Sequence, residues 1–172
     1  MSAMARVNPR AAALAPRRGF GLIEALTSVL LLSVCALAYA ALQARGLSAN
    51  SSAMWRSKAA LLSYEMADRM RANRAGVTAG SYRSLTTPSV VNDCGATSSC
   101  TPVRMAALDY AQWSTAIGVQ LPGGTGVVCV DSTPDDGTAD SPACDGAGTA
   151  YAVKVFWRER DQTSRLTVAV RP

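Results

Sequence analysis

The chain has 172 residues, a length that suits one globular domain with appendages, and 49% of them are hydrophobic. Seventeen basic and twelve acidic residues give a formal net charge of +5. All twelve acids follow Gly19, whereas four of the bases precede it: Arg6, Arg10, Arg17 and Arg18. Without these four, thirteen bases stand against twelve acids. The rest of the chain is therefore nearly neutral, which argues against the basic surface of a nucleic-acid-binding protein.

The residue types and motifs of common enzyme sites are missing from the sequence. It has no histidine, the commonest general base, and no recognisable phosphate-binding loop or nucleophile-elbow motif. We therefore predict a protein that is not an enzyme, has no catalytic residue, needs no cofactor and acts on no small-molecule substrate.

Residues 1–19 form a predicted leader rich in Ala, Arg and Pro, and an apolar segment without proline follows at residues 20–42. As a helix, these 23 residues would rise about 34 Å at 1.5 Å per residue, enough to cross a bilayer core of about 30 Å. The bases ahead of the segment predict that its N-terminal end stays in the cytoplasm. Its only acid, Glu24, is costly inside a membrane and calls for a functional explanation.

An ordinary secretory signal peptide is the alternative interpretation of the N-terminal region. The triplet Ala38-Tyr39-Ala40 resembles a small-x-small cleavage site. The length of the apolar segment, the long leader and the early acid all favour a retained membrane anchor instead.

Residues 43–74 show an amphipathic pattern that predicts the second half of the same helix, packed with one face on a domain. The predicted inner face recurs every fourth residue, at Met54, Lys58, Leu62, Met66 and Met70, with Trp55 and Leu61 beside it. We expect one long helix from about Phe20 to about Arg74, ended by Gly76 and Gly80. The weak helix formers of residues 46–52 are its most flexible point, and a true break there is the alternative.

Residues 75–172 form the predicted globular region, which begins with a loop at 77–101. A short helix should begin at Thr101 and Pro102, bury one face and stop at Gly118. That face is formed by Ala106, Tyr110, Trp113 and Ile117. A hairpin-type turn at 121–124 should precede strands at 127–130, 151–157 and 166–170, with a turn at 160–163. At least three antiparallel strands packed on the long helix make an α+β fold.

The sequence has five cysteines, and four of them follow the apolar segment. Cys35, inside that segment, is interpreted as a small apolar residue. The other four allow three connectivities. We favour Cys94–Cys100 and Cys129–Cys144, because each pair closes a local, turn-rich loop. The larger loop should stabilise the fold by about 3 kcal/mol. A metal site is disfavoured, since the chain lacks both Cys-x-x-Cys pairs and histidine.

An acidic tract runs through the larger of these loops and ends at the residue after it, Asp145. Clustered carboxylates suit calcium, and the tract offers Asp131, Asp135, Asp136, Asp140 and Asp145. Their spacing does not follow the Asp-x-Asp-x-Asp-Gly pattern, because two of them are adjacent. We therefore expect a solvated loop bounded by a disulfide, with a calcium site as the alternative.

The junction Gly19-Phe20, followed by Leu22-Ile23-Glu24 and a long apolar run, resembles the class III signal of type IV pilins and pseudopilins. Further stretches are similar to the PilV family of minor pilins, also called type IV pilus modification proteins: residues 66–73, 121–129, 133–137, 144–146 and 151–155. The resemblance covers roughly residues 18–157. It implies the type IV pilin fold, in which a long N-terminal helix packs on a small antiparallel sheet.

The resemblance also implies roles for three residues at the start of the chain. Gly19 and Phe20 would flank the cleavage site of a prepilin peptidase, and the new amine of Phe20 would be N-methylated. Glu24 would act in subunit assembly, by pairing with the amine of Phe20 in its own or an adjacent subunit. At about 4 Å and an effective dielectric near 20, the gross attraction is roughly 4 kcal/mol, much of which desolvation offsets. An acid that extends to the lipid headgroups is the alternative.

The implied function is that of a minor pilin of a Gram-negative bacterium. It would sit in the inner membrane with its C-terminal domain in the periplasm, then enter the pilus with other minor pilins and the major pilin. A minor pseudopilin of a type II secretion system is the alternative within the same fold. A membrane-anchored module that binds DNA or a surface ligand is the alternative of a different class. Its basic patch would be Arg69, Arg71 and Arg74, which we interpret as a solvated helix face.

Overall fold

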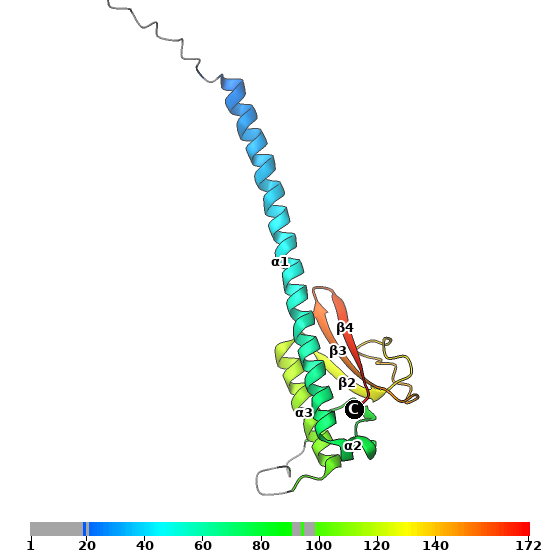
Figure 1. Ribbon diagram of the computed structural model, residues 1–172. Coiled ribbons are helices and arrows are strands. Elements are labelled where there is room, and N and C mark those ends of the chain that lie inside the picture. The colour runs from blue at the N-terminus through cyan, green and yellow to red at the C-terminus, as the bar shows by residue number, and fades with distance from the viewer. Residues whose placement is uncertain (1–18, 20, 91–93, 95–98) are drawn as a thin grey trace, which may run out of the picture. The chain divides into compact units, whose positions relative to one another are not determined.

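The structure, a computed structural model, describes residues 19, 21–90, 94 and 99–172. The predicted leader lies outside this part of the chain except for Gly19, and so does Phe20. Seven elements follow one another along the described residues (Figure 1): α1 (Leu22–Ala72), α2 (Arg74–Thr78), β1 (Ser84–Leu85), α3 (Pro102–Gln120), β2 (Thr125–Val130), β3 (Tyr151–Glu159) and β4 (Gln162–Val170). The chain divides into a first unit that ends at Gly46 and a second unit, Leu47–Pro172.

Helix α1 is continuous over 51 residues, as the sequence predicts, and no break occurs at residues 46–52. All three serines of this weak stretch are helical, and the hydroxyl of Ser51 donates a hydrogen bond to the carbonyl of Ser48, at 2.9 Å. Serine hydroxyls on a helix surface commonly donate a hydrogen bond to a backbone carbonyl of the preceding turn. The poor propensity of the stretch is therefore tolerated without a second helix.

The buried face of α1 is only partly the predicted one. Leu62, Met66 and Met70 are buried as expected, but Met54 and Leu61 are exposed. A strict spacing of four residues drifts by about 40° per step around a helix of 3.6 residues per turn, so it leaves the face it starts on. Alternating steps of three and four stay on one face, and they give the observed set: Ala59, Leu62, Ser63, Met66, Ala67 and Met70.

The region after α1 differs from the prediction that Gly76 ends the helix. Helix α1 ends at Ala72, and the side chain of Asn73 accepts a hydrogen bond from the amide of Gly76 at the start of α2. Gly76 is buried inside α2, where a Cβ atom would lie 2.9 Å from the carbonyl oxygen of Pro102. This glycine therefore permits a close approach, whereas Gly80, with φ of 76°, provides the positive φ after the helix.

Helix α3 begins where the sequence predicts. Thr101 is its N-cap, its side chain accepts from the amide of Arg104, and Pro102 takes the first turn. The predicted face is buried, but the helix runs past Gly118 to Gln120. Residues 121–124 then connect α3 to β2, so the turn precedes the strands as expected.

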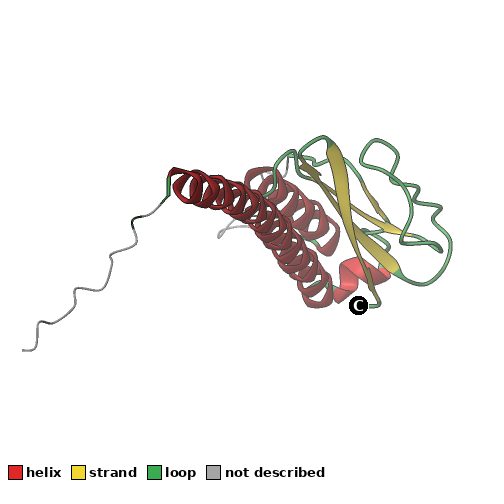
Figure 2. Ribbon diagram, turned by 90° about the horizontal axis from the view of Figure 1, so that it is seen from above, coloured by secondary structure: helices red, strands yellow, loops and turns green. Residues whose placement is uncertain are grey.

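The sheet has four antiparallel strands in the order β1-β2-β3-β4. Val128 of β2 pairs with Val153 of β3, which pairs in turn with Val168 of β4. Strand β1 has two residues and lies in a stretch that was predicted to be all loop. Helix α3 and the second half of α1 cover one face of the sheet, while loops lie over the other face (Figure 2). This is the type IV pilin fold that the sequence predicts.

Strand β3 is buried on both faces, although its alternating pattern predicted one buried face. Tyr151, Val153, Val155 and Trp157 join the core against the helices. Ala152, Lys154 and Phe156, on the other face, are buried as well. Residues 131–150, which we name the covering loop, shield this second face; the Cys129–Cys144 disulfide ties them to β2, and Cys144 packs against the small apolar cluster there.

Candidate assembly site

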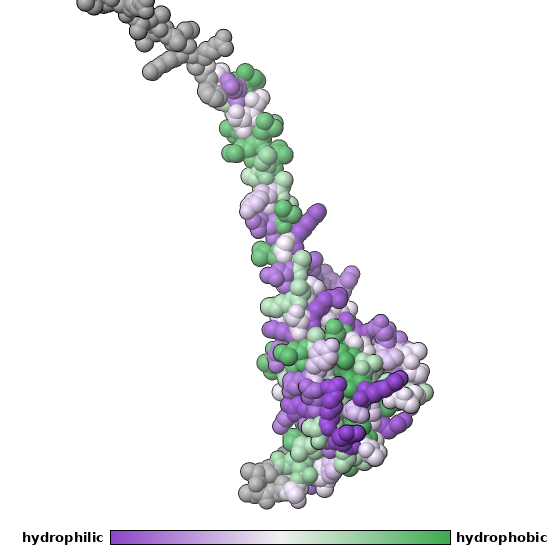
Figure 3. Space-filling view, in the orientation of Figure 1, coloured by the Kyte–Doolittle hydropathy of each residue, from purple (hydrophilic) through white to green (hydrophobic). Residues whose placement is uncertain are grey.

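The N-terminal half of α1 has no packing partner in the described part of the chain. An 18-residue window of the helix is apolar enough and long enough to cross a membrane, and none of that window is buried. Figure 3 shows apolar side chains gathered along this half of the helix. The exposed large apolar side chains are Leu22, Ile23, Leu26, Val29, Leu30, Leu31, Leu32, Val34, Leu37, Tyr39 and Leu42. A surface of this kind needs lipid or other apolar helices around it.

Glu24 lies in the first turn of this helix and is exposed. The amides of Glu24 and Ala25 both donate to the carbonyl of Gly21 at the start of the helix, at 3.0 and 3.1 Å. The carbonyl of Glu24 accepts hydrogen bonds from the hydroxyls of Thr27 and Ser28, at 3.0 and 2.7 Å. No side chain among the described residues pairs with its carboxylate. An acid in this position is favoured by the helix dipole and is open to a partner from outside.

The other two predicted site residues precede the helix. Gly19 is exposed, and a Cβ atom placed on it would meet nothing within 4 Å. Phe20 lies outside the described residues. The geometry between the Phe20 amine and Glu24, and the cleavage between Gly19 and Phe20, therefore stay predictions.

The cysteines have the pairing that the sequence analysis favours. The structure contains the disulfides Cys94–Cys100 and Cys129–Cys144. Cys35 is free and exposed on the apolar half of α1. Cys129, Cys144 and Asp131 also lie close enough together to suggest a metal site. Both sulfurs are bonded to each other, however, so this group offers no thiolate to a metal ion.

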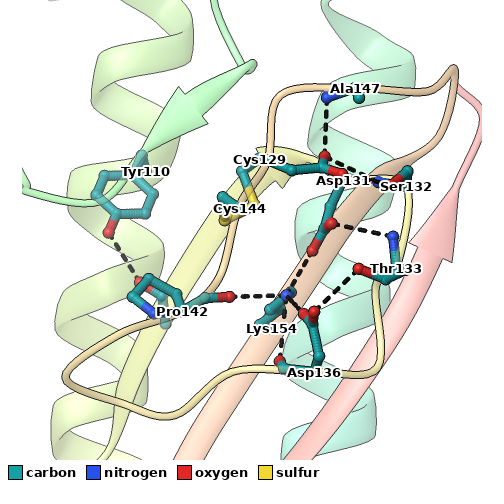
Figure 4. Close-up of a disulfide and its surroundings, with 12 residues drawn as sticks. Tyr110, Cys129, Asp131, Ser132, Thr133, Asp136, Pro142, Cys144, Ala147 and Lys154 are labelled. Carbon is teal, nitrogen blue, oxygen red and sulfur yellow. Dashed lines mark hydrogen bonds and ion pairs between the residues drawn. A yellow bond between two sulfur atoms is a disulfide. The ribbon is translucent and has the colours of Figure 1, made fainter.

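An ion-pair cluster in the covering loop is the main feature that sequence reasoning missed. The Lys154 ammonium, on β3, lies 2.5 Å from a carboxylate oxygen of Asp131 and 2.9 Å from one of Asp136. It also donates to the carbonyl of Pro142, at 2.7 Å (Figure 4). A lysine between valines in a strand was the available signal, because a cation in such a place is buried only when it is paired.

The acidic tract is therefore mostly occupied by groups of the protein itself. Asp135 pairs with Arg165 of β4, whose guanidinium also donates to the carbonyl of Gly137, at 2.5 Å. Asp145 accepts from the hydroxyl and amide of Ser132 and from the amide of Ala147. Asp131 is buried, whereas Asp135, Asp140 and Asp145 are exposed, so the tract is solvated as expected except at Asp131. Since these carboxylates already have partners, the geometry gives no support to a calcium site.

Hydrogen bonding and burial shift several pKa values in the globular unit. The hydrogen bond from Lys154 lowers the pKa of Asp136, and the one from the Ser132 hydroxyl lowers the pKa of Asp145. Burial raises the pKa of Tyr110 to about 12, and its hydroxyl donates to the carbonyl of Gly126 at 2.8 Å. Each of these shifts moves the group further from neutral pH, so each group keeps one charge state there.

The candidate basic patch on α1 is largely neutralised. Arg69 pairs with Glu65 at 2.8 Å and with Asp109 at 3.2 Å, and it also donates to Gln112. Arg71 pairs with Asp68 at 2.6 Å. Two of the three guanidiniums are thus committed to neighbouring carboxylates, which favours a structural role over contact with nucleic acid phosphates.

Comparison with known proteins agrees with the fold. Residues 41–111 match the family model described as Type IV pilin Tt1218. This stretch holds the second half of α1, α2, β1 and the first half of α3. None of the curated proteins matches the chain, and no solved structure matches it. The match supports the type IV pilin superfamily, and it does not reach the Gly19–Glu24 region or the covering loop.

Proposed function

We propose that this chain is a minor pilin of a type IV pilus in a Gram-negative bacterium, related to the PilV family. The observation that carries the proposal is an exposed, membrane-length apolar half-helix with one acid, Glu24, in its first turn, joined to a compact α+β unit. Such a half-helix is suited to two surroundings, a bilayer and a bundle of like helices, because both are apolar. A pilin subunit passes from the bilayer into the helix bundle, so its half-helix must suit both surroundings.

In this proposal, a prepilin peptidase cuts between Gly19 and Phe20, and the new Phe20 amine is methylated. The precursor lies in the inner membrane with its C-terminal unit in the periplasm. Assembly then exchanges lipid for the helices of other minor pilins and the major pilin. The carboxylate of Glu24, which pairs with no side chain among the described residues, contacts the Phe20 amine of an adjacent subunit and thereby sets the register of the incoming helix.

The maturation step is tested by N-terminal sequencing and intact mass measurement of the chain extracted from membranes. A chain that begins at Phe20 with a methylated amine supports the proposal. A chain that begins at Met1 or at Ala41 overturns it. Gly19→Val should block the cut, since a Cβ branch hinders approach to the backbone. Gly21→Ala is the matched control, because its Cβ would meet only Ile23, at an ordinary 3.9 Å.

The assembly role is tested in a strain that lacks the chain. Loss of piliation and twitching, restored by the wild-type chain, supports a pilus subunit, and co-purification with the other minor pilins identifies its neighbours. Normal piliation with loss of exoprotein secretion would instead assign the chain to a type II secretion system as a minor pseudopilin.

A further inference from the structure

A buried lysine and a buried aspartate meet beneath the covering loop. The side chains of Lys154 and Asp131 are both 0% exposed, and the Nζ atom lies 2.5 Å from Oδ2 of Asp131 (Figure 4). Within the described residues, this Oδ2 atom has no hydrogen-bond donor of good geometry. The contact therefore places an amine nitrogen against a carboxyl group that nothing else holds on that side.

The groups around the pair are arranged for a reaction between them. The other oxygen of Asp131, Oδ1, accepts a hydrogen bond from the amide of Thr133, at 3.1 Å. A second carboxylate, Asp136, accepts from Nζ at 2.9 Å, and the carbonyl of Pro142 accepts from it at 2.7 Å. Lys154 thus has a proton acceptor, and the carboxyl carbon of Asp131 has a donor on the oxygen where negative charge would build.

We propose that Lys154 and Asp131 condense to an intramolecular amide, an isopeptide bond between Nζ and Cγ. The lysine ammonium first gives one proton to Oδ2 of Asp131, which leaves a neutral amine beside a neutral carboxylic acid. The amine attacks Cγ, and the charge on Oδ1 is stabilised by the Thr133 amide. Asp136 takes the second proton from nitrogen and returns it to Oδ2, which leaves as water. Ammonium and carboxylate become one amide and one water, and Asp136 is regenerated.

Burial favours this outcome over a permanent ion pair. Two charges removed from water carry a large desolvation cost, and the neutral forms that react avoid it. Groups held in contact react with effective concentrations of about 10⁵–10⁸ M. Asp136 is the carboxylate that stays free, because its side chain is 46% exposed and water can solvate it afterwards. The same opening gives the released water a way out.

The product would join the end of β2 to the middle of β3 and close a covalent ring over residues 131–154. That ring contains Cys144, whose disulfide to Cys129 ties the same loop to β2. The amide would hold the covering loop in reducing conditions, where the disulfide opens. This inference does not depend on the proposed function, since it rests on the globular unit alone.

The test is the intact mass of the purified full chain after reduction and unfolding. The expected wild-type mass is lower by one water than the mass of its own polypeptide sequence. Lys154→Arg keeps a cation in place but should show the full mass, since a guanidinium is a poor nucleophile. Asp136→Asn keeps both reacting groups and should slow or abolish the loss of water.

Fragmentation of a tryptic digest locates the bond. A branched peptide that links the Asp131 segment to Lys154 supports the proposal. A wild-type chain of full mass, with cleavage by trypsin after Lys154, overturns it and leaves a plain ion pair. Loss of water confined to Asp131, with Lys154 free, also overturns it. Both measurements are made on the wild-type chain, so the test does not require any variant to fold.

Discussion

The indole nitrogen of Trp113 donates a hydrogen bond to the main-chain carbonyl of Leu62, at 2.7 Å. This bond ties α3 to the middle of the buried face of α1, and both residues are buried. It fixes how far the two helices can slide along each other. A side chain that packs in an apolar core thus also sets the register of the helix layer over the sheet.

Trp113→Phe should lower the free energy of unfolding by about 1–3 kcal/mol, because it removes this hydrogen bond and leaves unfilled volume. Urea unfolding of the full chain in detergent, followed by circular dichroism, measures the change. Trp55→Phe is the matched control, since Trp55 is half-buried and should cost less. Equal losses in the two variants would contradict the role of the bond to Leu62.

Two glycines of the α3–β2 region should respond in opposite directions to alanine. At Gly126 a Cβ would lie 2.5 Å from Ile117 and 2.6 Å from the Trp113 ring, so Gly126→Ala should destabilise the fold by about 1–3 kcal/mol. Gly118 lies inside α3 with its nearest neighbour 4.0 Å away. Gly118→Ala should therefore stabilise the helix by about 0.5–1 kcal/mol. The same urea assay compares both variants, and a loss of stability in Gly118→Ala would contradict the observed extent of α3.

The covering loop should weaken in acid. The pKa of Asp145 is held below its usual range, chiefly by the Ser132 hydroxyl and then by the amides of Ala147 and Ser132. Because the folded pKa lies below the unfolded one, this stabilisation is complete above roughly pH 4 and is lost as the pH falls through the folded value. Ser132→Ala should raise the pKa of Asp145, which NMR titration of the carboxyl carbon measures. Asp140→Asn, an exposed change in the same loop, should leave that pKa in place.

Glu24→Ala should leave peptidase processing intact and lower incorporation into pili. A net loss of only about 1.4 kcal/mol at each subunit contact corresponds to a tenfold weaker association. Immunoblots of sheared pili against membrane fractions give the ratio. Ser33→Ala is the matched control, since its hydroxyl donates a hydrogen bond to the carbonyl of Leu30 within the same half-helix. Unchanged incorporation of Glu24→Ala would end the proposed role of the carboxylate.

The sequence predicts the elements whose signals are local. A continuous helix follows from the apolar run and the amphipathic pattern after it, and the start of α3 follows from Thr101 and Pro102. The strand pattern of β2 to β4 is likewise carried by neighbouring residues. Gly76 and Gly118 were both predicted to end a helix, because glycine favours helix ends. Gly76 instead lies inside α2, where it packs closely against Pro102, and Gly118 lies inside α3, which continues to Gln120.

The candidate site divides in the same way. Gly19, Phe20 and Glu24 stand out because their spacing within one short segment is the signal itself. Lys154 does not, because its partners Asp131 and Asp136 come from a loop that the sequence only describes as acidic. Which carboxylates fold over which strand depends on the order of the strands in the sheet, and that order is not written in a local pattern. Two-residue β1 is missed for the same reason, since it exists only by pairing with β2.

The division of α1 at Gly46 places two different demands on one helix. Before Gly46, no neighbour within the described chain packs against the helix. Many apolar substitutions that keep its overall hydrophobicity should therefore be tolerated there. After Gly46, Ala59, Met66 and Ala67 are buried in the core. A substitution there that keeps the hydrophobicity but changes the shape of the side chain should destabilise the fold. Homologous chains should therefore vary among apolar residues in the first half, Glu24 apart, and keep side-chain size position by position in the second.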